Sequence, residues 1–256
     1  MKLSVVLATY NEEENIGKCL EAVVKEVEEI IVIDGGSSDK TVEIAKKFGA
    51  KISITDNPLI FHINKQKGVD LASGDWIFQL DADEIVTPDL LREIKEKIKT
   101  TEFQAYYLKR RNFFLKTWLK KGGQYPDPVI RLFQKGVGKF PCKSVHEQIA
   151  ITGRVGLLEH DLLHYTAKTF SRYLLNSNRY TSLTAHEFQK ENVGLSFPAR
   201  IHFIFVKPLF TFLKLYIRHK GFLDGFPGFV FAFFSGLHIF TSYIKYYEFQ
   251  KRDGNL

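Results

Sequence analysis

Cysteine, methionine and tryptophan are scarce in this sequence of 256 residues, which contains 2, 1 and 2 of them respectively. Cys19 and Cys142 are too few for a disulfide framework and lack the Cys-x-x-Cys spacing of a metal site. No signal peptide is visible, because the apolar run at 3–8 is short and leads directly into an acidic segment. We therefore expect reduced thiols and a cytoplasmic protein.

The sequence also lacks the patterns of two nucleotide-related classes of protein. No glycine-rich loop with a basic residue follows the first apolar run, which disfavours a nucleotidyltransferase. The formal net charge is +7, yet the 23 phenylalanines gather late in the chain instead of alternating with arginine. We therefore expect a membrane surface as a partner and no nucleic acid.

An acidic cluster at 81–84 follows directly after the apolar run 76–80. If strand pairing persists, Asp81 and Asp83 share one face and repel by roughly 3 kcal/mol at about 5 Å and an effective dielectric of 20. A divalent cation relieves such repulsion, and carboxylate oxygens favour Mg²⁺ or Mn²⁺. The alternative is a solvated acidic turn that leads into a helix capped by Thr87 or Asp89.

Strands and helices alternate along the first hundred residues. Apolar runs predict strands at 3–8, 29–33, 51–54 and 76–80, and the segments between them predict helices at 11–27, 40–48 and 61–71. This alternation predicts an α/β fold with a mostly parallel sheet and flanking helices. Ligands of such sheets bind beyond the carboxyl ends of strands, where this chain carries Thr9, Asn11, Asp34, Asp81 and Asp83.

Three motifs in this order resemble the family 2 inverting glycosyltransferases of the GT-A fold. They are Thr9-Tyr10-Asn11-Glu12, Asp34-Gly35-Gly36-Ser37 and Asp81-Ala82-Asp83. Residues 126–133 and the Val145-His146-Glu147 segment resemble the bacterial lipopolysaccharide-core glycosyltransferases in particular. The second motif departs from the usual Asp-Asp-Gly-Ser at Gly35, which we interpret as a variation in the pocket for the base.

The resemblance implies a metal-dependent hexosyltransferase. It implies a GT-A catalytic domain over residues 1–168, with a nucleotide-sugar half at 1–100 and an acceptor half at 101–168. The donor is expected to be a nucleotide-sugar, preferably a UDP-sugar, with Mg²⁺ or Mn²⁺ on its diphosphate. The acceptor is expected to be a glycan or a lipid-linked glycan of the cell envelope, such as the lipopolysaccharide core. Two alternatives are a polyprenyl-phosphate glycosyltransferase and a non-catalytic nucleotide-sugar-binding membrane protein.

The resemblance also implies roles for the nucleotide-binding side chains. Thr9, Asn11 and Asp34 would hold the nucleoside, with Asp34 accepting hydrogen bonds from the base. Lys65 would neighbour the base and phosphates, and Asp81 would lie near the ribose and the metal. For Lys65 the alternative is a solvated helix face.

Four further residues are implied for the cation and the transfer step. Asp83 would ligate the cation, and His164 would be a third contact to the cation or the diphosphate. An acceptor hydroxyl needs a general base, for which Glu147 is the first choice and Asp127 the second. His164 also follows His160 at a spacing that, on a helix, is more often a satisfied pair, and Asp127 lies in a proline-flanked segment that a structural loop explains equally.

Residues 169–256 form the C-terminal part, where we expect an amphipathic, basic and aromatic helical extension. A helix is predicted near 171–189, and cations stand beside dense aromatic residues at 201–220. The segment 225–244 has no formal charge and is long enough to cross a bilayer. We favour a monotopic or re-entrant attachment over a full span, at the cytoplasmic face of the inner membrane. Helices that form a homo-oligomer interface are the alternative.

Overall fold

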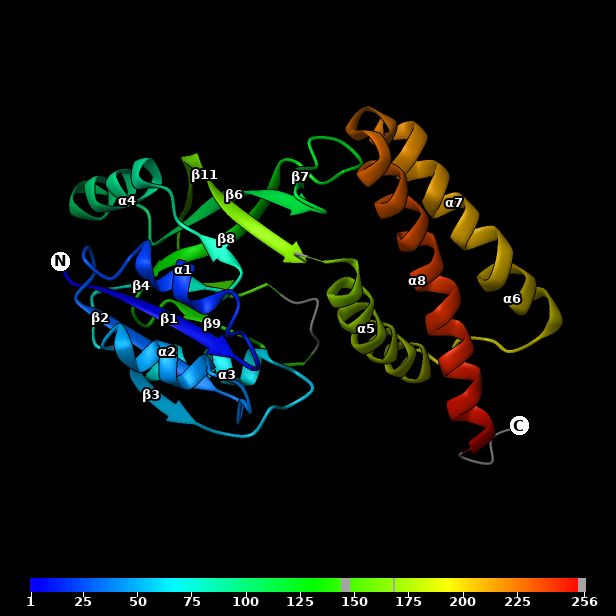
Figure 1. Ribbon diagram of the computed structural model, residues 1–256, viewed down its shortest axis with the longest axis horizontal. Coiled ribbons are helices and arrows are strands. Elements are labelled where there is room, and N and C mark those ends of the chain that lie inside the picture. Colours follow the sequence, from blue (N-terminus) through cyan, green and yellow to red (C-terminus); the bar gives the residue numbers. More distant parts are fainter. Residues whose placement is uncertain (144–147, 168, 253–256) are drawn as a thin grey trace. The chain divides into compact units, whose positions relative to one another are not determined.

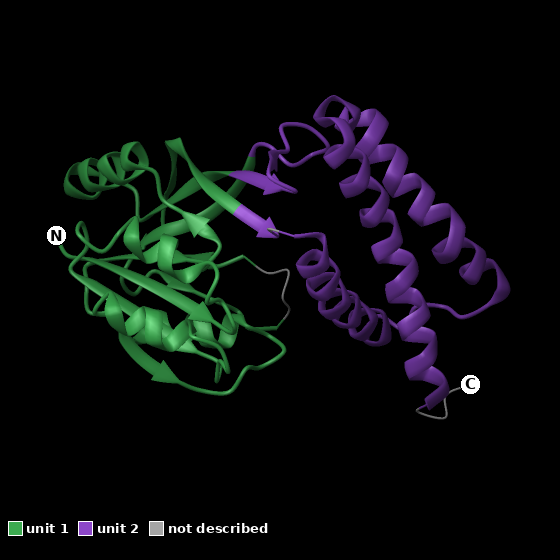
Figure 2. Cartoon of the chain, viewed as in Figure 1, with its two compact units in different colours: residues 1–110, 127–164 green, residues 111–126, 165–256 purple. Residues whose placement is uncertain are grey.

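The computed structural model describes residues 1–143, 148–167 and 169–252, which divide into two compact units (Figures 1 and 2). Unit 1 comprises residues 1–110 and 127–164, and unit 2 comprises residues 111–126 and 165–256. We describe each unit separately.

Unit 1 is an α/β unit built on one mixed sheet. Its strands in chain order are β1 (Leu3–Thr9), β2 (Glu29–Asp34), β3 (Lys51–Ile54), β4 (Trp76–Leu80), β5 (Glu84–Ile85), β6 (Ala105–Phe114), β8 (Asp127–Gln134), β9 (Gly138–Lys139), β10 (Ala150–Ile151) and β11 (Val155–Ala167), where β9 and β10 form a separate pair. The helices are α1 (Ile16–Glu21), α2 (Thr41–Lys47), α3 (His62–Leu71) and α4 (Pro88–Thr100).

The main sheet has the strand order β3-β2-β1-β4-β8-β6-β11-β5. The strands β3, β2, β1 and β4 are parallel, as the alternation of strands and helices predicted. The second half is antiparallel where β4 meets β8, β8 meets β6 and β11 meets β5. The prediction of a mostly parallel sheet therefore holds for the first hundred residues, and the later strands add an antiparallel half.

The strands β1, β2 and β4 are mainly apolar and almost wholly buried because both faces of the sheet are covered there, whereas the edge strand β3 is exposed or half-buried. On β1, Val5 and Leu7 belong to a cluster with Leu20 and Ile94 of the covering helices, whereas Val6 belongs to a second cluster on the other face. A methyl group added at Gly68 of α3 would lie 2.4 Å from a Val6 methyl. Gly68 thus permits the close approach of α3 to the sheet.

Helix α1 is shorter than the predicted helix at 11–27. Asn11 has a φ of 53°, which interrupts a right-handed helix, and the next two residues bond to Asp39 and to Thr41 at the start of α2. The backbone N–H of Glu12 donates to the hydroxyl of Thr41, and that of Glu13 donates to Asp39. These contacts give partners to two N–H groups that precede α1, which begins at Ile16.

Unit 2 is mainly helical within its described residues. It contains α5 (Phe170–Lys190), α6 (Phe197–Ile201), the π-helical turn η1 (His202–Val206), α7 (Lys207–Leu213), a second π-helical turn η2 (Lys214–Arg218), the 3₁₀ turn η3 (Gly221–Asp224) and α8 (Gly225–Arg252). The short strand β7 (Thr117–Trp118) pairs with the end of β6. Buried Ala185 and Phe188 of α5 pack with Tyr243 and Tyr246 of α8.

Candidate active site

The ends of β1 and β2 lie side by side, and their terminal side chains bond to each other. Thr9 and Asp34 are register partners, and the Thr9 hydroxyl donates to Oδ2 of Asp34 at 2.8 Å. Asp34 is fully buried and also accepts from the backbone N–H of Gly36 at 3.1 Å and from that of Ser37 at 2.7 Å. Asp34 therefore closes the loop that follows β2.

Asn11 joins this loop to the one after β1. Its backbone N–H donates to the Ser37 hydroxyl at 2.8 Å, and its Oδ1 accepts from the N–H of Ser38 at 2.9 Å. At Gly35, a Cβ would lie 3.0 Å from Cβ of Asn57, so the position that usually holds a second Asp is packed closely here. The structure thus brings Thr9, Asn11 and Asp34 together in one hydrogen-bonded pair of loops.

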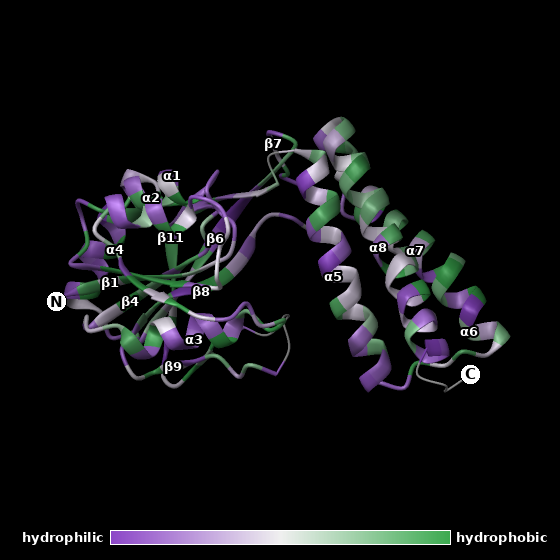
Figure 3. Ribbon diagram, turned by 60° about the horizontal axis from the view of Figure 1, so that its bottom comes forward, coloured by the Kyte–Doolittle hydropathy of each residue, from purple (hydrophilic) through white to green (hydrophobic). Residues whose placement is uncertain are grey.

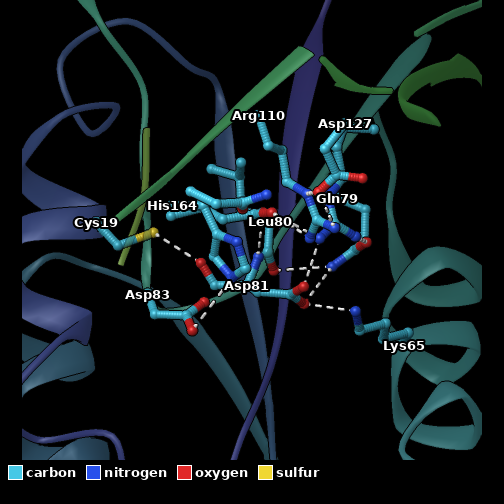
Figure 4. Close-up of polar contacts among 12 residues, drawn as sticks. Cys19, Lys65, Gln79, Leu80, Asp81, Asp83, Arg110, Asp127 and His164 are labelled. Carbon is cyan, nitrogen blue, oxygen red and sulfur yellow. Dashed lines mark hydrogen bonds and ion pairs between the residues drawn. The ribbon is translucent and has the colours of Figure 1, made fainter. Parts of the chain in front are cut away.

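Asp81 and Asp83 do not share a face. Strand β4 ends at Leu80, and the chain turns so that the N–H of Glu84 donates to the carbonyl of Asp81 at 3.0 Å. Figure 4 shows the two carboxylates directed to different partners. The predicted alternation was wrong at this point because it required the strand to continue past its last paired residue.

Asp81 lies between two cationic side chains. Nζ of Lys65 is 2.5 Å from its Oδ1, and Nη2 of Arg131 is 2.5 Å from its Oδ2 (Figure 4). Burial alone raises the pKa of Asp81, but Arg131 and Lys65 together hold that pKa well below its usual range. Asp81 is consequently an anion near neutral pH.

Lys65 is buried, with 5% of its surface exposed, so the alternative of a solvated helix face was wrong. Burial lowers the pKa of its ammonium group, and the neighbouring Asp81 opposes that shift. Its Nζ also lies 5.0 Å from the centre of the Phe61 ring. Lys65 is thus held at the site by both a carboxylate and an aromatic face.

Arg131 extends the charged contacts beyond Asp81. Its Nη2 also donates to Oε1 of fully buried Glu84 at 2.7 Å, and Arg110 lies 3.6 Å from the same oxygen. Arg110 in turn lies 2.7 Å from Oδ2 of Asp127. Six side chains of alternating charge therefore run from Lys65 to Asp127.

The sequence did not predict the structural role of Glu84, nor that of Gln79, which accepts a hydrogen bond from Arg131. Oε2 of Glu84 also accepts from the backbone N–H of Asp81 at 2.9 Å. One signal for Gln79 was present, since it is the polar residue within the apolar run 76–80. No comparable signal distinguished Glu84 from an ordinary exposed acid.

Asp83 lies beside His164 on the other side of this turn. Oδ2 of Asp83 is 3.5 Å from Nε2 of His164, and their side chains are 26% and 14% exposed. His164 belongs to β11, where it is the register partner of Glu84. His160 lies in the same strand instead of on a helix, and its Nδ1 contacts Glu93 at 2.8 Å. Of the two histidines, the structure therefore brings His164 to the acidic motif.

The Asp83 and His164 pair fits a divalent cation that is completed by other ligands. Two ligands on one octahedral cation with bonds of about 2.1 Å are about 3 Å apart, close to the 3.5 Å observed. Carboxylate oxygen suits Mg²⁺ and Mn²⁺, and an imidazole nitrogen favours the transition metal of the two. No group of three or more potential protein ligands occurs among the described residues, so a donor diphosphate would have to supply the remaining oxygens.

The structure describes only one of the two expected candidates for the general base, Asp127. Asp127 begins β8, and its side chain is 30% exposed and paired with Arg110. Glu147 lies outside the described residues.

Polar side chains at the carboxyl ends of β1, β2 and β4, on a sheet that continues into an antiparallel half, define the GT-A class of glycosyltransferases. The model of the family described as "Glycosyl transferase family 2" matches residues 4–153, and the chain belongs to this family. The predicted family, GT-A fold and glycosyltransferase class are therefore confirmed, and the metal dependence stays a prediction.

Relatives in sequence cover almost the whole chain. The lipopolysaccharide core biosynthesis glycosyltransferase LpsC of Rhizobium meliloti is 28% identical over 97% of this chain and 93% of its own length. An uncharacterized glycosyltransferase of Rickettsia prowazekii is 28% identical over 90% of this chain and 81% of its own length. The similarity therefore extends beyond the family match into the helical part.

Two solved structures show the same fold. The mannosyltransferase PcManGT from Pyrobaculum calidifontis, in complex with GDP-Man and Mn²⁺, has a TM-score of 0.58 at 13% identity, over 96% of this chain and 86% of that one. Staphylococcus aureus TarS 1–349, in complex with UDP-GlcNAc, has a TM-score of 0.52 at 14% identity, over 99% and 92%.

Proposed function

We propose that this glycosyltransferase moves a sugar from a nucleoside-diphosphate sugar, preferably a UDP-sugar, to a glycan or lipid-linked acceptor of the cell envelope with inversion. The observation that carries the proposal is the gathering of Thr9, Asp34, Asp81 and Asp83 at the carboxyl ends of three neighbouring parallel strands. The relative named for lipopolysaccharide core biosynthesis supports the type of acceptor. The solved structures with UDP-GlcNAc and with GDP-Man support a nucleotide-sugar donor.

In this proposal Thr9, Asn11 and Asp34 shape the pocket for the nucleoside. The oxygens of Asp34 already accept hydrogen bonds from its own loop, so its main contribution is to fix the backbone that faces the base. A fixed loop lowers the entropy that donor binding would otherwise cost. Lys65 lies next to Asp81 and supplies positive charge for the phosphates.

Asp81 and Asp83 have separate roles. Asp81 accepts from Lys65, Gln79 and Arg131, which leaves about one lone-pair position of its carboxylate for a ribose hydroxyl. Because Lys65 and Arg131 already lie on its two oxygens, Asp81 is a poor position for a divalent cation. Asp83 and His164 would hold the cation, which would offset the charge that develops on the departing diphosphate.

The acceptor hydroxyl loses its proton to a carboxylate. We keep Glu147 as the first choice for this general base, because its place in the sequence matches the position that the family resemblance indicates. Asp127 is the second choice, since it is already committed to an ion pair with Arg110 at 2.7 Å. In either case the base acts on the face of the sugar opposite the diphosphate, which produces inversion.

Membrane attachment is the third element of the proposal. The helical part binds the cytoplasmic face of the inner membrane as a peripheral or monotopic element, which brings the enzyme to a lipid-linked acceptor. The helix at Gly221–Arg252 is long and apolar enough to cross a bilayer; an 18-residue stretch of it has a mean hydropathy of 1.4, and 22% of that stretch is buried. Homo-oligomer formation through the same helices is the competing role for this surface.

A panel of nucleotide-sugars tested with Mg²⁺ or Mn²⁺ for thermal stabilisation examines the donor directly. Binding to the folded state at 100 times the dissociation constant stabilises it by about 2.7 kcal/mol, which is a measurable shift in melting temperature. We expect one UDP-sugar to give the largest shift and Mn²⁺ to increase it more than Mg²⁺ does. No shift from any donor, with or without metal, would oppose the proposed function.

A further inference from the structure

Residues 201–218, which run from the last residue of α6 through η1, α7 and η2, alternate between exposed and half-buried pairs with a period of four. Two exposed residues are followed by two half-buried ones through the whole segment. The exposed apolar members are Ile201, Phe205, Val206, Leu209, Phe210, Leu213 and Ile217, with exposed fractions between 40% and 62%. We call these seven residues the apolar face.

A period of four does not match a regular α-helix. With 3.6 residues per turn, each step of four residues rotates by about 40° beyond a full turn, so four steps would carry the face about 160° around the helix. The turns η1 and η2 are π-helical and hold more residues per turn, which rotates the pattern back. The two π-helical turns therefore keep the apolar face on one side.

No exposed Lys, Arg, Asp or Glu interrupts the apolar face between Arg200 and Lys214. The one cation within that interval, Lys207, is half-buried and points inward, with Nζ 4.7 Å from the centre of the Phe203 ring and 5.8 Å from that of Phe188. The contact with Phe188 of α5 holds this ammonium group within unit 2. Hydrophobic residues thus dominate α7 and much of α8 in Figure 3.

Cations gather at the η2 end of the apolar face. Lys214, Arg218 and Lys220 are exposed there. The backbone N–H groups of Lys120 and Lys121 donate to Asp224 at 3.1 and 2.8 Å, which fixes these two exposed lysines beside the same turn. This end of the apolar face therefore carries five cations and one carboxylate, that of Asp224, which accepts hydrogen bonds from the backbone. The net positive charge of this end is complementary to anionic headgroups.

The size and surroundings of these helices favour a flat orientation over a span. The apolar face covers 16 steps from Ile201 to Ile217, or about 24 Å, which is less than the hydrocarbon thickness of about 30 Å. Helix α8 cannot be surrounded by lipid, because polar α5 packs against it and Nζ of Lys245 contacts Oδ1 of Asn178 at 2.7 Å. An amphipathic helix with these properties lies in the headgroup region.

We propose that the apolar face docks flat on a bilayer with anionic headgroups, while Lys214, Arg218, Lys220, Lys120 and Lys121 contact those headgroups. This inference rests on the membrane attachment of the proposed function and specifies the surface that performs it. It is independent of the donor and of the catalytic residues.

The test uses the full chain and vesicles of phosphatidylcholine with or without phosphatidylglycerol. We expect Phe205→Gln with Phe210→Gln to lower the partition coefficient on anionic vesicles at least about tenfold, because two large apolar side chains leave the bilayer. The matched control is Leu174→Gln with Leu175→Gln on α5, where the side chains are 43% and 67% exposed. This control should bind within about twofold of the unchanged protein. Equal losses in both double variants would overturn the proposal.

A charge variant tests the headgroup contact. Lys214→Glu with Arg218→Glu should weaken binding to anionic vesicles at least about tenfold, since each charge near the surface contributes favourably. The matched control, Lys25→Glu with Lys46→Glu, makes the same charge change at exposed residues of unit 1 and should have a much smaller effect. An equal loss in the two charge variants would contradict the assigned surface.

Bromine-labelled lipids give a readout that does not depend on loss of binding. Relative to the unchanged protein, which contains Trp76 and Trp118, Phe210→Trp should add fluorescence that is quenched by bromine placed near the headgroup end of the acyl chains, whereas Leu175→Trp should add fluorescence that is not quenched. Equal quenching at both positions, or quenching at neither, would refute the proposal. A dimer in sedimentation that Phe205→Gln with Phe210→Gln converts to monomer, with vesicle binding unchanged, would assign the apolar face to a second copy instead.

Donor-induced thermal stabilisation separates this inference from the proposed function. Variants of the apolar face should retain that stabilisation, which also shows that they fold. Absence of vesicle binding by the unchanged protein, with donor stabilisation intact, contradicts this inference and the membrane attachment on which it rests, but not the proposed sugar transfer. Vesicle binding without stabilisation by any donor contradicts the proposed transfer function alone.

Discussion

The guanidinium of Arg131 donates to Oδ2 of Asp81 at 2.5 Å, and this contact separates the two carboxylates of the acidic motif. Arg131 belongs to β8, which pairs antiparallel with β4, so the later half of the sheet supplies the counter-charge for Asp81. Asp83 points to His164 instead. One aspartate is thus neutralised by protein cations, while the other lies beside the imidazole of His164.

Replacing Arg131 should strongly destabilise unit 1. Arg131 is 7% exposed, and Asp81 and Glu84 raise the pKa of its guanidinium even though burial opposes them. Arg131→Met leaves these two carboxylates without their shared cation, so we expect the free energy of unfolding to fall by about 3–5 kcal/mol. Urea denaturation at pH 7 measures this change.

Arg154→Met is the control for that experiment. Arg154 pairs with Glu102 at 2.6 Å, but the two side chains are 63% and 68% exposed. An ion pair in solvent contributes about 0–1 kcal/mol, so this variant should be nearly neutral. Similar losses in both variants would show that the buried network around Asp81 does not stabilise the sheet.

Glu29 should make stability depend on pH in the acid range. Burial alone raises the pKa of Glu29, but hydrogen bonds from Lys51, Ser4 and Ser73 outweigh it and lower the pKa from 4.5 to about 2. A lowered pKa in the folded state stabilises the protein above the unfolded value and loses this effect as the pH falls toward 2. Glu29→Gln should therefore cost about 2 kcal/mol at pH 7.

Chemical denaturation at a series of pH values tests this linkage. The difference between the unchanged protein and Glu29→Gln should shrink between pH 4.5 and about 2, the range set by the two pKa values. Glu102→Gln, at an exposed ion pair, is the control. A difference for Glu29→Gln that stays constant through this range would contradict the assigned network.

Glu147→Gln and Asp127→Asn distinguish the candidates for the general base. Loss of a general base lowers turnover by about 10²–10⁴-fold, whereas donor binding should persist because neither residue is assigned to the nucleotide. We expect Glu147→Gln to show this pattern in single-turnover transfer with nucleotide binding measured in parallel. The same pattern in Asp127→Asn, with Glu147→Gln active, would assign the base to β8.

Much of unit 1 was predictable because β1, β2 and β4 are buried on both faces and the edge strand β3 alternates between polar and apolar residues. The apolar runs at 29–33, 51–54 and 76–80 match β2, β3 and β4 within one residue. Strand ends also located the polar cluster, since parallel strands place their carboxyl ends together. The antiparallel half was not predicted, because strands of mixed polarity such as β6 and β11 have no strong period and pair over long sequence separations.

The partners within the site were harder to predict than its location. Arg131 has no sequence feature that separates phosphate binding from structural pairing, and its contact with Asp81 depends on the pairing of β8 with β4. The directions of the Asp81 and Asp83 side chains depend on where β4 ends. The strand ends at Leu80, directly before the acidic motif, so the alternation of a strand does not extend to these two residues. The local sequence pattern was thus enough to find the acidic motif, but the partners of its side chains depend on strand pairing between distant parts of the chain.

The separation of roles between Asp83 and Asp81 is tested most directly by the affinity for Mn²⁺ in the presence of UDP, measured by electron paramagnetic resonance of free Mn²⁺. Asp83→Asn should lower this affinity at least about tenfold while circular dichroism remains unchanged, and His164→Ala should lower it in the same direction. Asp70→Asn, at an exposed side chain bonded to Gln66, is the control. Asp81→Asn should retain most of the Mn²⁺ affinity, because its oxygens face Lys65 and Arg131. Unchanged affinity in Asp83→Asn, or an equal loss in Asp81→Asn, would contradict the account.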